Sequence, residues 1–164
     1  MRYSKDLSNI RKSILSSIQN SDSGHLGPSF SCTEILYIIL KKYINFKNKN
    51  RNKIILSKGH AAPAIYAIYD HLNLLKKNEL NTLRKFTSRL QGHPDKKKLK
   101  LLDFGTGALG QGLSVSIGYS LSSKLLNKKN FIFCVLGDGE LQEGQVWEAA
   151  MYIGSNNIRN IITF

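Results

Sequence analysis

Cysteine, acidic residues and long apolar runs are scarce in this 164-residue chain. With only two cysteines, a disulfide-stapled scaffold or a cysteine-based metal site is disfavoured. No apolar run approaches the roughly 20 residues that cross a bilayer, so no membrane partner is expected. What remains fits one soluble globular domain with its own core. Cys32 and Cys134 stand in apolar surroundings and are predicted to be buried free thiols of a reducing compartment.

The shortage of acidic residues gives the chain a net charge of +13, from 24 Lys and Arg against 11 Asp and Glu. Nucleic-acid-binding proteins cluster such charge on one face, often between aromatic residues. Here it lies mainly in two connector-like runs, Lys47 to Lys53 and Lys96 to Lys100. The many Lys, Asn and Ile residues share A/T-rich codons, and a biased genome explains the charge more simply. Nucleic-acid binding is therefore the weaker hypothesis, and no nucleic-acid partner is expected.

The N-terminal segment, Met1 to Gln19, has Arg, Lys and Ser at helical spacing, as a transit peptide does. It also contains Asp6 and continues without a break into the following segment. We therefore interpret it as a structural helix and expect a cytoplasmic protein. One side of this helix should be apolar and buried, and its predicted members are Leu7, Ile10, Ile14, Leu15 and Ile18.

Hydrophobic periodicity predicts alternating helices and strands along the rest of the chain. Ser31 and Glu34 form a capping-box pattern that should start a helix reaching about Tyr43. Further helices are expected at 60–75, shortly after 78, at 110–126 and at 142–154, and strands at 54–56, 131–136 and 160–164. The segment 91–105 has no period and should be a loop. This alternation predicts an α/β fold, a parallel sheet with helices on both faces.

The segment Gly137-Asp138-Gly139 follows an apolar strand and opens into a helical pattern. Ligands of α/β folds bind at such carboxyl ends of strands. Glycines let the backbone approach a bound group, and a helix start offers N–H groups to an anion. An Asp beside phosphate favours a bridging divalent cation. The alternative is a strand-to-helix turn with a capping Asp and a solvated acidic helix, and spacing alone leaves both open.

Five segments, in order, resemble the motifs of transketolases. The segment from Gly137 to Met151 resembles the family's thiamine-diphosphate motif. The others are Gly24-His25-Leu26-Gly27, Ser57-Lys58-Gly59-His60-Ala61, Leu90-Gln91-Gly92-His93-Pro94 and Thr106-Gly107-Ala108-Leu109-Gly110-Gln111-Gly112-Leu113-Ser114. The resemblance covers the chain from about Ser13 onward, and five ordered motifs are far more specific than any one.

The resemblance implies a thiamine-diphosphate-binding fold with thiamine diphosphate and Mg²⁺ as cofactors. It implies that His60 contacts the diphosphate, whereas His25 and His93 face the sugar as catalytic residues. Main chain beside the cofactor rings would come from Gly107, Ala108 and Leu109, with Ala108 a mild departure from the family's Ser or Pro. As loop histidines taken singly, each of the three would be a simple hydrogen-bonding residue.

In the glycine-flanked motif, the resemblance implies that Asp138 is a metal ligand and that Gly137 and Gly139 contact the cofactor. Glu143 matches a carboxylate near the family's subunit interface that links two cofactor sites. Glu140 and Glu148 are expected to be helix-surface charges. Trp147 is expected to be a core or interface anchor, and His71 to be structural.

The resemblance also implies a division of the enzyme. The family's second metal ligand, an Asn after the next strand, and its pyrimidine-binding domain have no counterpart in residues 1–164. We therefore expect a single diphosphate-side domain, shortened at its C-terminal end, that is active only in a homo- or hetero-oligomer with a C-terminal transketolase subunit. The implied reaction transfers a two-carbon ketol unit between sugar phosphates. Two alternatives stay open: an inactive transketolase-like remnant acting as a binding module, and another thiamine enzyme such as deoxyxylulose-phosphate synthase.

Overall fold

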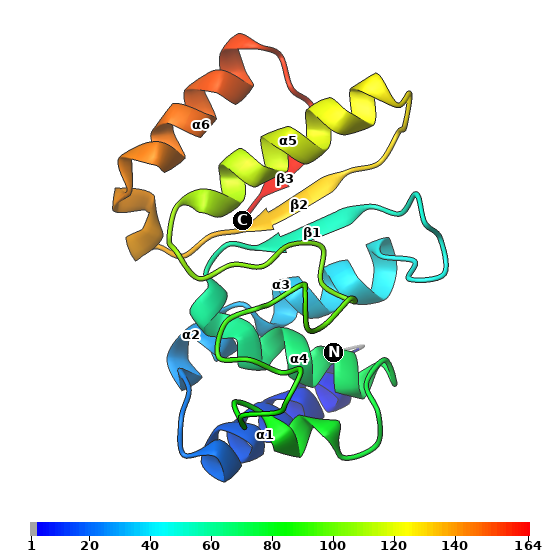
Figure 1. Ribbon diagram of the computed structural model, residues 1–164, viewed down its shortest axis with the longest axis vertical. Coiled ribbons are helices and arrows are strands. Elements are labelled where there is room, and N and C mark those ends of the chain that lie inside the picture. The colour runs from blue at the N-terminus through cyan, green and yellow to red at the C-terminus, as the bar shows by residue number, and fades with distance from the viewer. Residues whose placement is uncertain (1–2) are drawn as a thin grey trace.

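A three-stranded sheet between two layers of helices forms the framework of the computed structural model, which describes residues 3–164 (Figure 1). The α-helices are α1 (Ser4–Ser21), α2 (Leu26–Ser31), α3 (Thr33–Ile38), α4 (Ala62–His71), α5 (Gln111–Leu125) and α6 (Gly144–Ser155). The strands are β1 (Lys53–Leu56), β2 (Ile132–Val135) and β3 (Ile161–Thr163). Single turns of 3₁₀-helix occupy Gly59–Ala61, Glu79–Thr82 and Gly139–Gln142.

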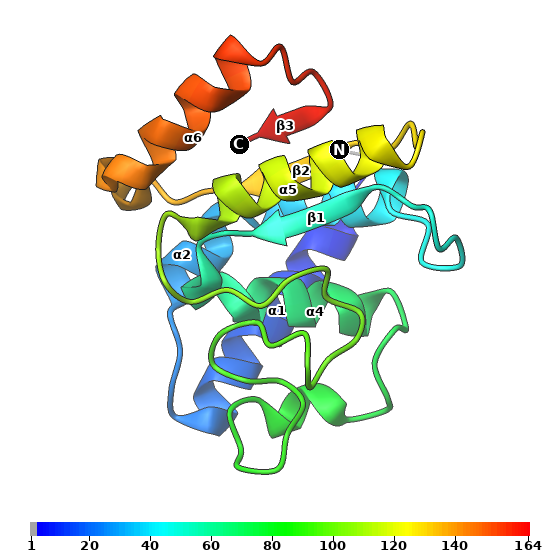
Figure 2. The same cartoon turned by 45° about the horizontal axis from the view of Figure 1, so that its top comes forward.

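The strands are all parallel and lie in the order β1-β2-β3. In the register of the first pair, Lys53 lies opposite Ile132 and Leu56 opposite Val135, so both strands end at the same edge of the sheet. The predicted α/β class, with a parallel sheet and helices on both faces, is confirmed. Helices α5 and α6 cover one face, whereas α1 to α4 lie on the other (Figure 2).

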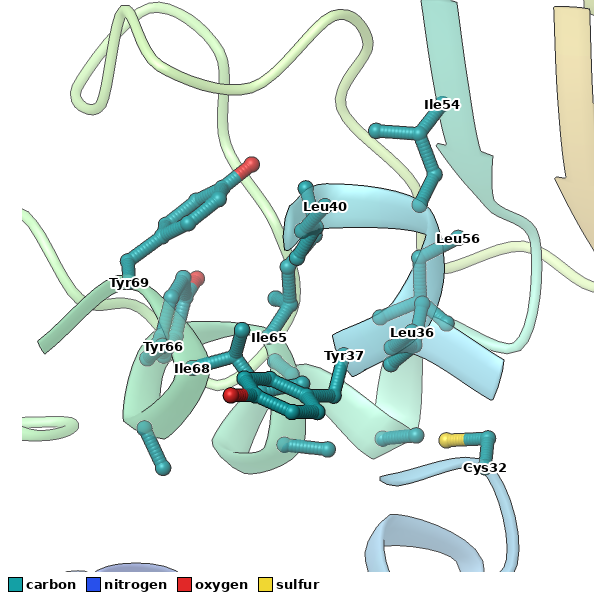
Figure 3. Packing of buried hydrophobic residues seen from close by; sticks show 14 of the residues in the cluster. Cys32, Leu36, Tyr37, Leu40, Ile54, Leu56, Ile65, Tyr66, Ile68 and Tyr69 are labelled. Atoms are coloured by element: carbon teal, nitrogen blue, oxygen red, sulfur yellow. The ribbon is translucent and has the colours of Figure 1, made fainter. Parts of the chain in front are cut away.

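The larger core lies between the sheet and helices α1, α3 and α4. Alternate strand residues, among them Ile54, Leu56 and Phe133, enter this layer. Figure 3 shows Ile54 and Leu56 of β1 on the right, near Leu36 of α3 and Leu40 of the π-helical turn Ile39–Tyr43, whereas Tyr66, Ile68 and Tyr69 of α4 lie further to the left. Every residue of α4 from Ala62 to Tyr69 is buried, which explains why this helix is apolar all round rather than amphipathic.

The smaller core lies on the opposite face, under α5 and α6. Ile55, Ile132 and Cys134 point into it from the strands and meet Leu113 and Val146 of the helices. Both cysteines are buried and free, as predicted. Burial raises the pKa of the Cys32 thiol to about 11 and that of Cys134 to about 12, so neither is a thiolate at neutral pH.

Several predicted element boundaries are wrong. Ser31 and Glu34 form no capping box, because the chain is already helical from Leu26. The Ser31 hydroxyl donates to the Pro28 carbonyl, and Glu34 pairs with Arg11. The helix expected at 60–75 is α4, which ends at His71. In α1, Ile10 and Ile14 are fully buried as predicted, but Leu15 is 49% exposed and lies outside the apolar stripe. The prediction for Met1 falls outside the described residues.

A buried carboxylate fixes the long segment between α4 and α5 to the sheet. Asp103 is 3% exposed and accepts from the Ile54 N–H at 3.0 Å. Its carboxylate also binds the Arg51 guanidinium at 2.7 Å and lies 3.2 Å from the Lys53 ammonium. The two cations and the backbone N–H compensate the buried charge of the Asp103 carboxylate. Removal of that carboxylate would leave the Arg51 and Lys53 cations unpaired. The contact holds the loop that precedes α5 in place.

Two apolar surfaces remain uncovered in the described chain. On α6, Trp147 is 59% and Met151 67% exposed, so Trp147 is not a core residue. A groove of about 630 Å³ lies beside the sheet, and its lining is almost wholly apolar: Ile35, Ile38, Ile39, Tyr43, Phe131, Phe133, Ile162 and Phe164 with Glu34. None of the helices within residues 3–164 is long and apolar enough to span a membrane.

Candidate active site

Three glycine-containing loops meet at the carboxyl edge of the sheet. The first follows β1 and runs from Ser57 to His60, and the second, Thr106 to Gly110, leads into α5. The third is Gly137-Asp138-Gly139, directly after β2. Since β1 and β2 end side by side, the first and third loops start from neighbouring positions at the sheet edge where ligands of α/β folds bind.

The first two loops touch through main chain. A Cβ built on Gly59 would lie 2.9 Å from the Thr106 Oγ1 and 3.0 Å from the Gly107 nitrogen. Thr106 in turn donates from its hydroxyl to the Leu56 carbonyl at 2.7 Å. Any side chain at Gly59 would push the loops apart, so its glycine is required by close approach rather than by an unusual φ.

The three predicted histidines gather around this contact. The rings of His25 and His60 pack edge to face, with centroids 5.7 Å apart. His93 lies against Gly107, where a Cβ would be 3.4 Å from the His93 ring. His25 precedes the first residue of α2 and His60 sits in the turn Gly59–Ala61, so each occupies the start of a helical segment.

His60 is held in its neutral form. Its partial burial lowers the pKa, and the positive charges of Lys58 and His25 lower it further. The buried Glu140 carboxylate opposes this shift but is a smaller influence. A neutral imidazole offers one donor and one acceptor, and it would gain a proton most readily when an anion approaches. His25 and His93 are exposed to solvent at this edge.

Lys58 is an unexpected member of the site. It is 7% exposed, and its ammonium donates to the Ser31 hydroxyl at 3.1 Å. No carboxylate among residues 3–164 lies within ion-pair distance of it. A buried ammonium with one hydrogen bond is costly unless an anion compensates it. Apart from the position of Lys58 between Ser57 and Gly59, no sequence pattern indicates that this lysine is buried.

Glu140 is not a surface charge, so that prediction is wrong. The side chain is 2% exposed and lies beneath the three loops. Its carboxylate accepts from the Ser57 hydroxyl at 2.5 Å and from the N–H groups of Gly110 at 2.7 Å and Gly137 at 2.9 Å. The 3₁₀ turn Gly139–Gln142 explains the error, because it turns Glu140 inward where a regular helix starting at Gln142 would not. Glu148 is exposed, as predicted.

Asp138 and Gly139 face solvent next to this buried carboxylate. A Cβ on Gly139 would have no atom within 4 Å, so open space lies in front of the motif. No group of three or more His, Cys, Asp or Glu within residues 3–164 could hold a metal ion. Mg²⁺, however, is commonly bound by one or two carboxylates together with phosphate oxygens and water. One exposed carboxylate beside open space, that of Asp138, fits that mode.

A side chain of α6 binds the second loop. The Gln145 amide donates to the Leu109 carbonyl at 2.6 Å and to no other residue of that loop. Gly110 has φ +78°, a conformation that favours glycine, and a Cβ there would lie 2.5 Å from the Gln145 amide nitrogen. Ala108 and Leu109 are thereby exposed at the site edge. Glu143, by contrast, is an exposed residue that immediately precedes α6.

A polar cavity of about 510 Å³ adjoins His93. Its lining consists of Arg84, Gln91, Gly92, His93, Pro94, Asp95, Gly105 and Thr106. Arg84 has φ +60° and its guanidinium lies against Gly92, where a Cβ would be 3.0 Å from Cζ. This cavity gives a polar solute access to His93 from solvent.

A profile of the family described as "Transketolase, thiamine diphosphate binding domain" matches residues 3–164. The chain belongs to the transketolase family. It is 37% identical to a transketolase of Pongo abelii over 165 residues, which cover 96% of this chain and 26% of that transketolase. It is 35% identical to the 6-deoxy-6-sulfo-D-fructose transketolase subunit SqwG of Clostridium sp. (strain MSTE9), covering 94% of this chain and 58% of that subunit.

The fold agrees with this membership. The crystal structure of transketolase from Campylobacter jejuni superposes with a TM-score of 0.85 at 29% identity, over 96% of this chain and 27% of that one. The chain thus spans about a quarter of the length of the transketolase of Pongo abelii, 26%, and of the superposed crystal structure, 27%. The resemblance seen in the motifs is confirmed for the family and the thiamine-diphosphate-binding fold.

Proposed function

We propose that this chain is the diphosphate-binding part of a transketolase, which uses thiamine diphosphate and Mg²⁺ to move a two-carbon ketol unit from a ketose phosphate to an aldose phosphate. The observation that carries the proposal is the convergence of three motif loops on one buried carboxylate, which leaves three histidines and Asp138 at a single sheet edge. Family membership supports the same reading.

In this proposal Asp138 would hold Mg²⁺ together with phosphate oxygens, and the N–H groups of the Gly137–Gly139 loop would bind the diphosphate. His60, whose pKa is lowered, would donate a hydrogen bond to a phosphate oxygen, and the buried Lys58 ammonium would supply nearby positive charge. Gly107, Ala108 and Leu109 present main chain to the cofactor rings, because Gly107 carries no side chain and Ala108 only a methyl group. When bound, the cofactor supplies the carbon nucleophile that the protein does not have.

His25 and His93 would act on the sugar. Both are exposed beside the contact of the first two loops, and His93 opens onto the polar cavity. An imidazole there can donate to a sugar hydroxyl, accept its proton and stabilise charge that develops during transfer. Glu143 and the exposed apolar side chains of α6 would face a second subunit, and a C-terminal part would supply the pyrimidine-binding half in the cytoplasm.

A binding-only remnant is the second candidate, because no group of three or more His, Cys, Asp or Glu among residues 3–164 could hold a metal ion. The relatives named above are transketolases, which gives no support to a deoxyxylulose-phosphate synthase.

Residues 1–164 alone are expected to show no ketol transfer at saturating cofactor and Mg²⁺, because the groups that activate the cofactor ring are supplied elsewhere. Mixed or fused with the C-terminal part, the chain should bind thiamine diphosphate in calorimetry and show turnover in a coupled assay. Turnover by the chain alone would contradict the division of the site. Cofactor binding without turnover in the assembled protein would favour the remnant, and absence of binding would overturn both candidates.

Substitution of two histidines should separate cofactor binding from sugar chemistry. In the assembled enzyme His93→Ala should lower kcat/KM for the ketose by about 100-fold with little change in cofactor affinity. His60→Ala should instead weaken thiamine diphosphate binding by about tenfold, the effect of one lost hydrogen bond to a charged group. Calorimetry and steady-state kinetics measure both. His71→Ala, at the other end of α4, is the control, and two variants that both lose only cofactor affinity would refute the division of roles.

A further inference from the structure

We propose that Glu140 is a positioning residue whose buried carboxylate sets the relative placement of the three loops that receive the diphosphate cofactor. The inference rests on the proposed function, and it assigns a role to a residue that touches neither the cofactor nor the sugar.

Each of its donors comes from a different loop. Ser57 belongs to the loop after β1, Gly110 to the loop before α5, and Gly137 to the loop after β2. One carboxylate oxygen accepts from the Ser57 hydroxyl and the Gly110 N–H, whereas the other accepts from the Gly137 N–H. No other side chain among residues 3–164 bonds all three loops, so their mutual spacing depends on this group.

Ser57 extends the network into α5. Its hydroxyl oxygen accepts from the Gly112 N–H at 3.1 Å while the hydroxyl donates to Glu140. The first turn of α5 and the end of β1 are therefore tied through the same carboxylate. A shift of Glu140 would move the start of α5 together with Gly107 to Leu109.

Hydrogen-bond donors, rather than a cation, compensate the buried charge of the Glu140 carboxylate. Glu140 makes no ion pair with any Lys or Arg of the described residues. A buried charge without a counter-ion is retained only if short, well-directed hydrogen bonds replace its hydration. Two backbone N–H groups and one hydroxyl provide this, and they fix the loops in return.

The Gly137 bond gives the direct link to the ligand. Gly137 immediately precedes Asp138, and its N–H is held at 2.9 Å from Glu140. Asp138 carries the exposed carboxylate, and open space lies in front of the next residue, Gly139. Loosening Gly137 should therefore misplace the metal ligand without removing it.

Glu140→Gln is the informative variant, because it keeps the size and shape of the side chain. Its amide oxygen can still accept from Ser57 and Gly110, but its NH₂ group would face the Gly137 N–H, and two donors would meet. Ser57→Ala is the second variant, since it removes one donor and leaves the carboxylate. Glu148→Gln is the matched control, an exposed glutamate on α6 that loses the same charge.

The test uses the assembled enzyme with Mg²⁺, at a temperature where every variant is folded. Glu140→Gln should weaken thiamine diphosphate binding by about tenfold, one lost hydrogen bond to a charged group, and leave the KM of the sugar near the wild-type value. Saturating cofactor should restore kcat, and Glu148→Gln should match the wild type. Hydrogen exchange measured by mass spectrometry should be faster in segments 107–112 and 137–142 of Glu140→Gln and Ser57→Ala only.

Unchanged cofactor affinity in folded Glu140→Gln would overturn the positioning role, whatever happens to its melting temperature. Unchanged exchange in both segments would also overturn it. If the wild-type assembly itself binds no thiamine diphosphate, the proposed function fails, whereas the exchange measurement still decides whether Glu140 sets the placement of the three loops.

Discussion

Asp138→Ala should abolish Mg²⁺-dependent thiamine diphosphate binding by the assembled enzyme, with affinity falling by more than about 100-fold. The carboxylate is exposed at the end of β2, beside open space and above a buried carboxylate that cannot reach solvent. No group of three or more His, Cys, Asp or Glu among the described residues could hold the metal ion in its place. Calorimetric titration with thiamine diphosphate, with and without Mg²⁺, measures the effect.

Two comparisons sharpen this result. Asp138→Asn keeps an oxygen ligand without its charge and should retain intermediate affinity, because Mg²⁺ prefers charged oxygen ligands but accepts amide oxygens. Glu148→Ala removes an exposed carboxylate from α6 and should bind the cofactor as the wild type does. Equal affinity of Asp138→Ala and wild type would show that the metal is held elsewhere.

The stability of the chain should fall sharply when Gly112 becomes alanine. A Cβ there would lie 2.4 Å from the Cβ and Oγ of Ser57 and 2.9 Å from its Cα, so α5 would have to move away from the end of β1. Overpacking of this kind costs about 1–3 kcal/mol of the free energy of unfolding. Urea denaturation monitored by circular dichroism measures it. The same shift would break the Gly112 N–H bond to Ser57.

Gly118→Ala provides the control within the same helix. A Cβ at Gly118 would meet no atom within 4 Å, so the substitution adds only helix propensity. We expect it to raise the free energy of unfolding by about 0.5–1 kcal/mol. If both variants lost stability equally, the close approach of α5 to β1 in the structure would be wrong.

The sequence predicted the layered fold well, because strand and helix periods are set by burial. The runs around Ile54 and Ile132 are buried strands, and the glycine-rich pattern from 111 to 125 is a helix that approaches its neighbour closely. Predicted helix boundaries were wrong where local hydrogen bonds compete with the sequence pattern that was used to place them. At Ser31, the side chain bonds back to Pro28 within a helix that has already begun, so its capping signal was misleading.

The loop histidines were predicted as a group from their motifs, and the structure brings His25, His60 and His93 to one edge. Their roles stay predictions. Glu140 could not be predicted, because its environment depends on a single 3₁₀ turn and on donors 83 and 30 residues away in the sequence. Lys58 was hidden for a similar reason: burial of a lysine is a tertiary property that spacing does not reveal.

The long separation between the partners of Glu140 also sets the order of events when the chain folds. Helices α1 to α4 and strand β1 lie within the first 71 residues and contribute most of the larger core, so they can collapse soon after synthesis. The Ser57–Glu140 bond closes a loop of 83 residues, and parallel strands pair slowly across such distances. Until β2 arrives, β1 is an unpaired edge on a formed helical layer, a state prone to aggregation. The three loops would therefore be able to bind an anion only after β2 has paired with β1. A chain that stops folding before this step would be unable to bind the anion.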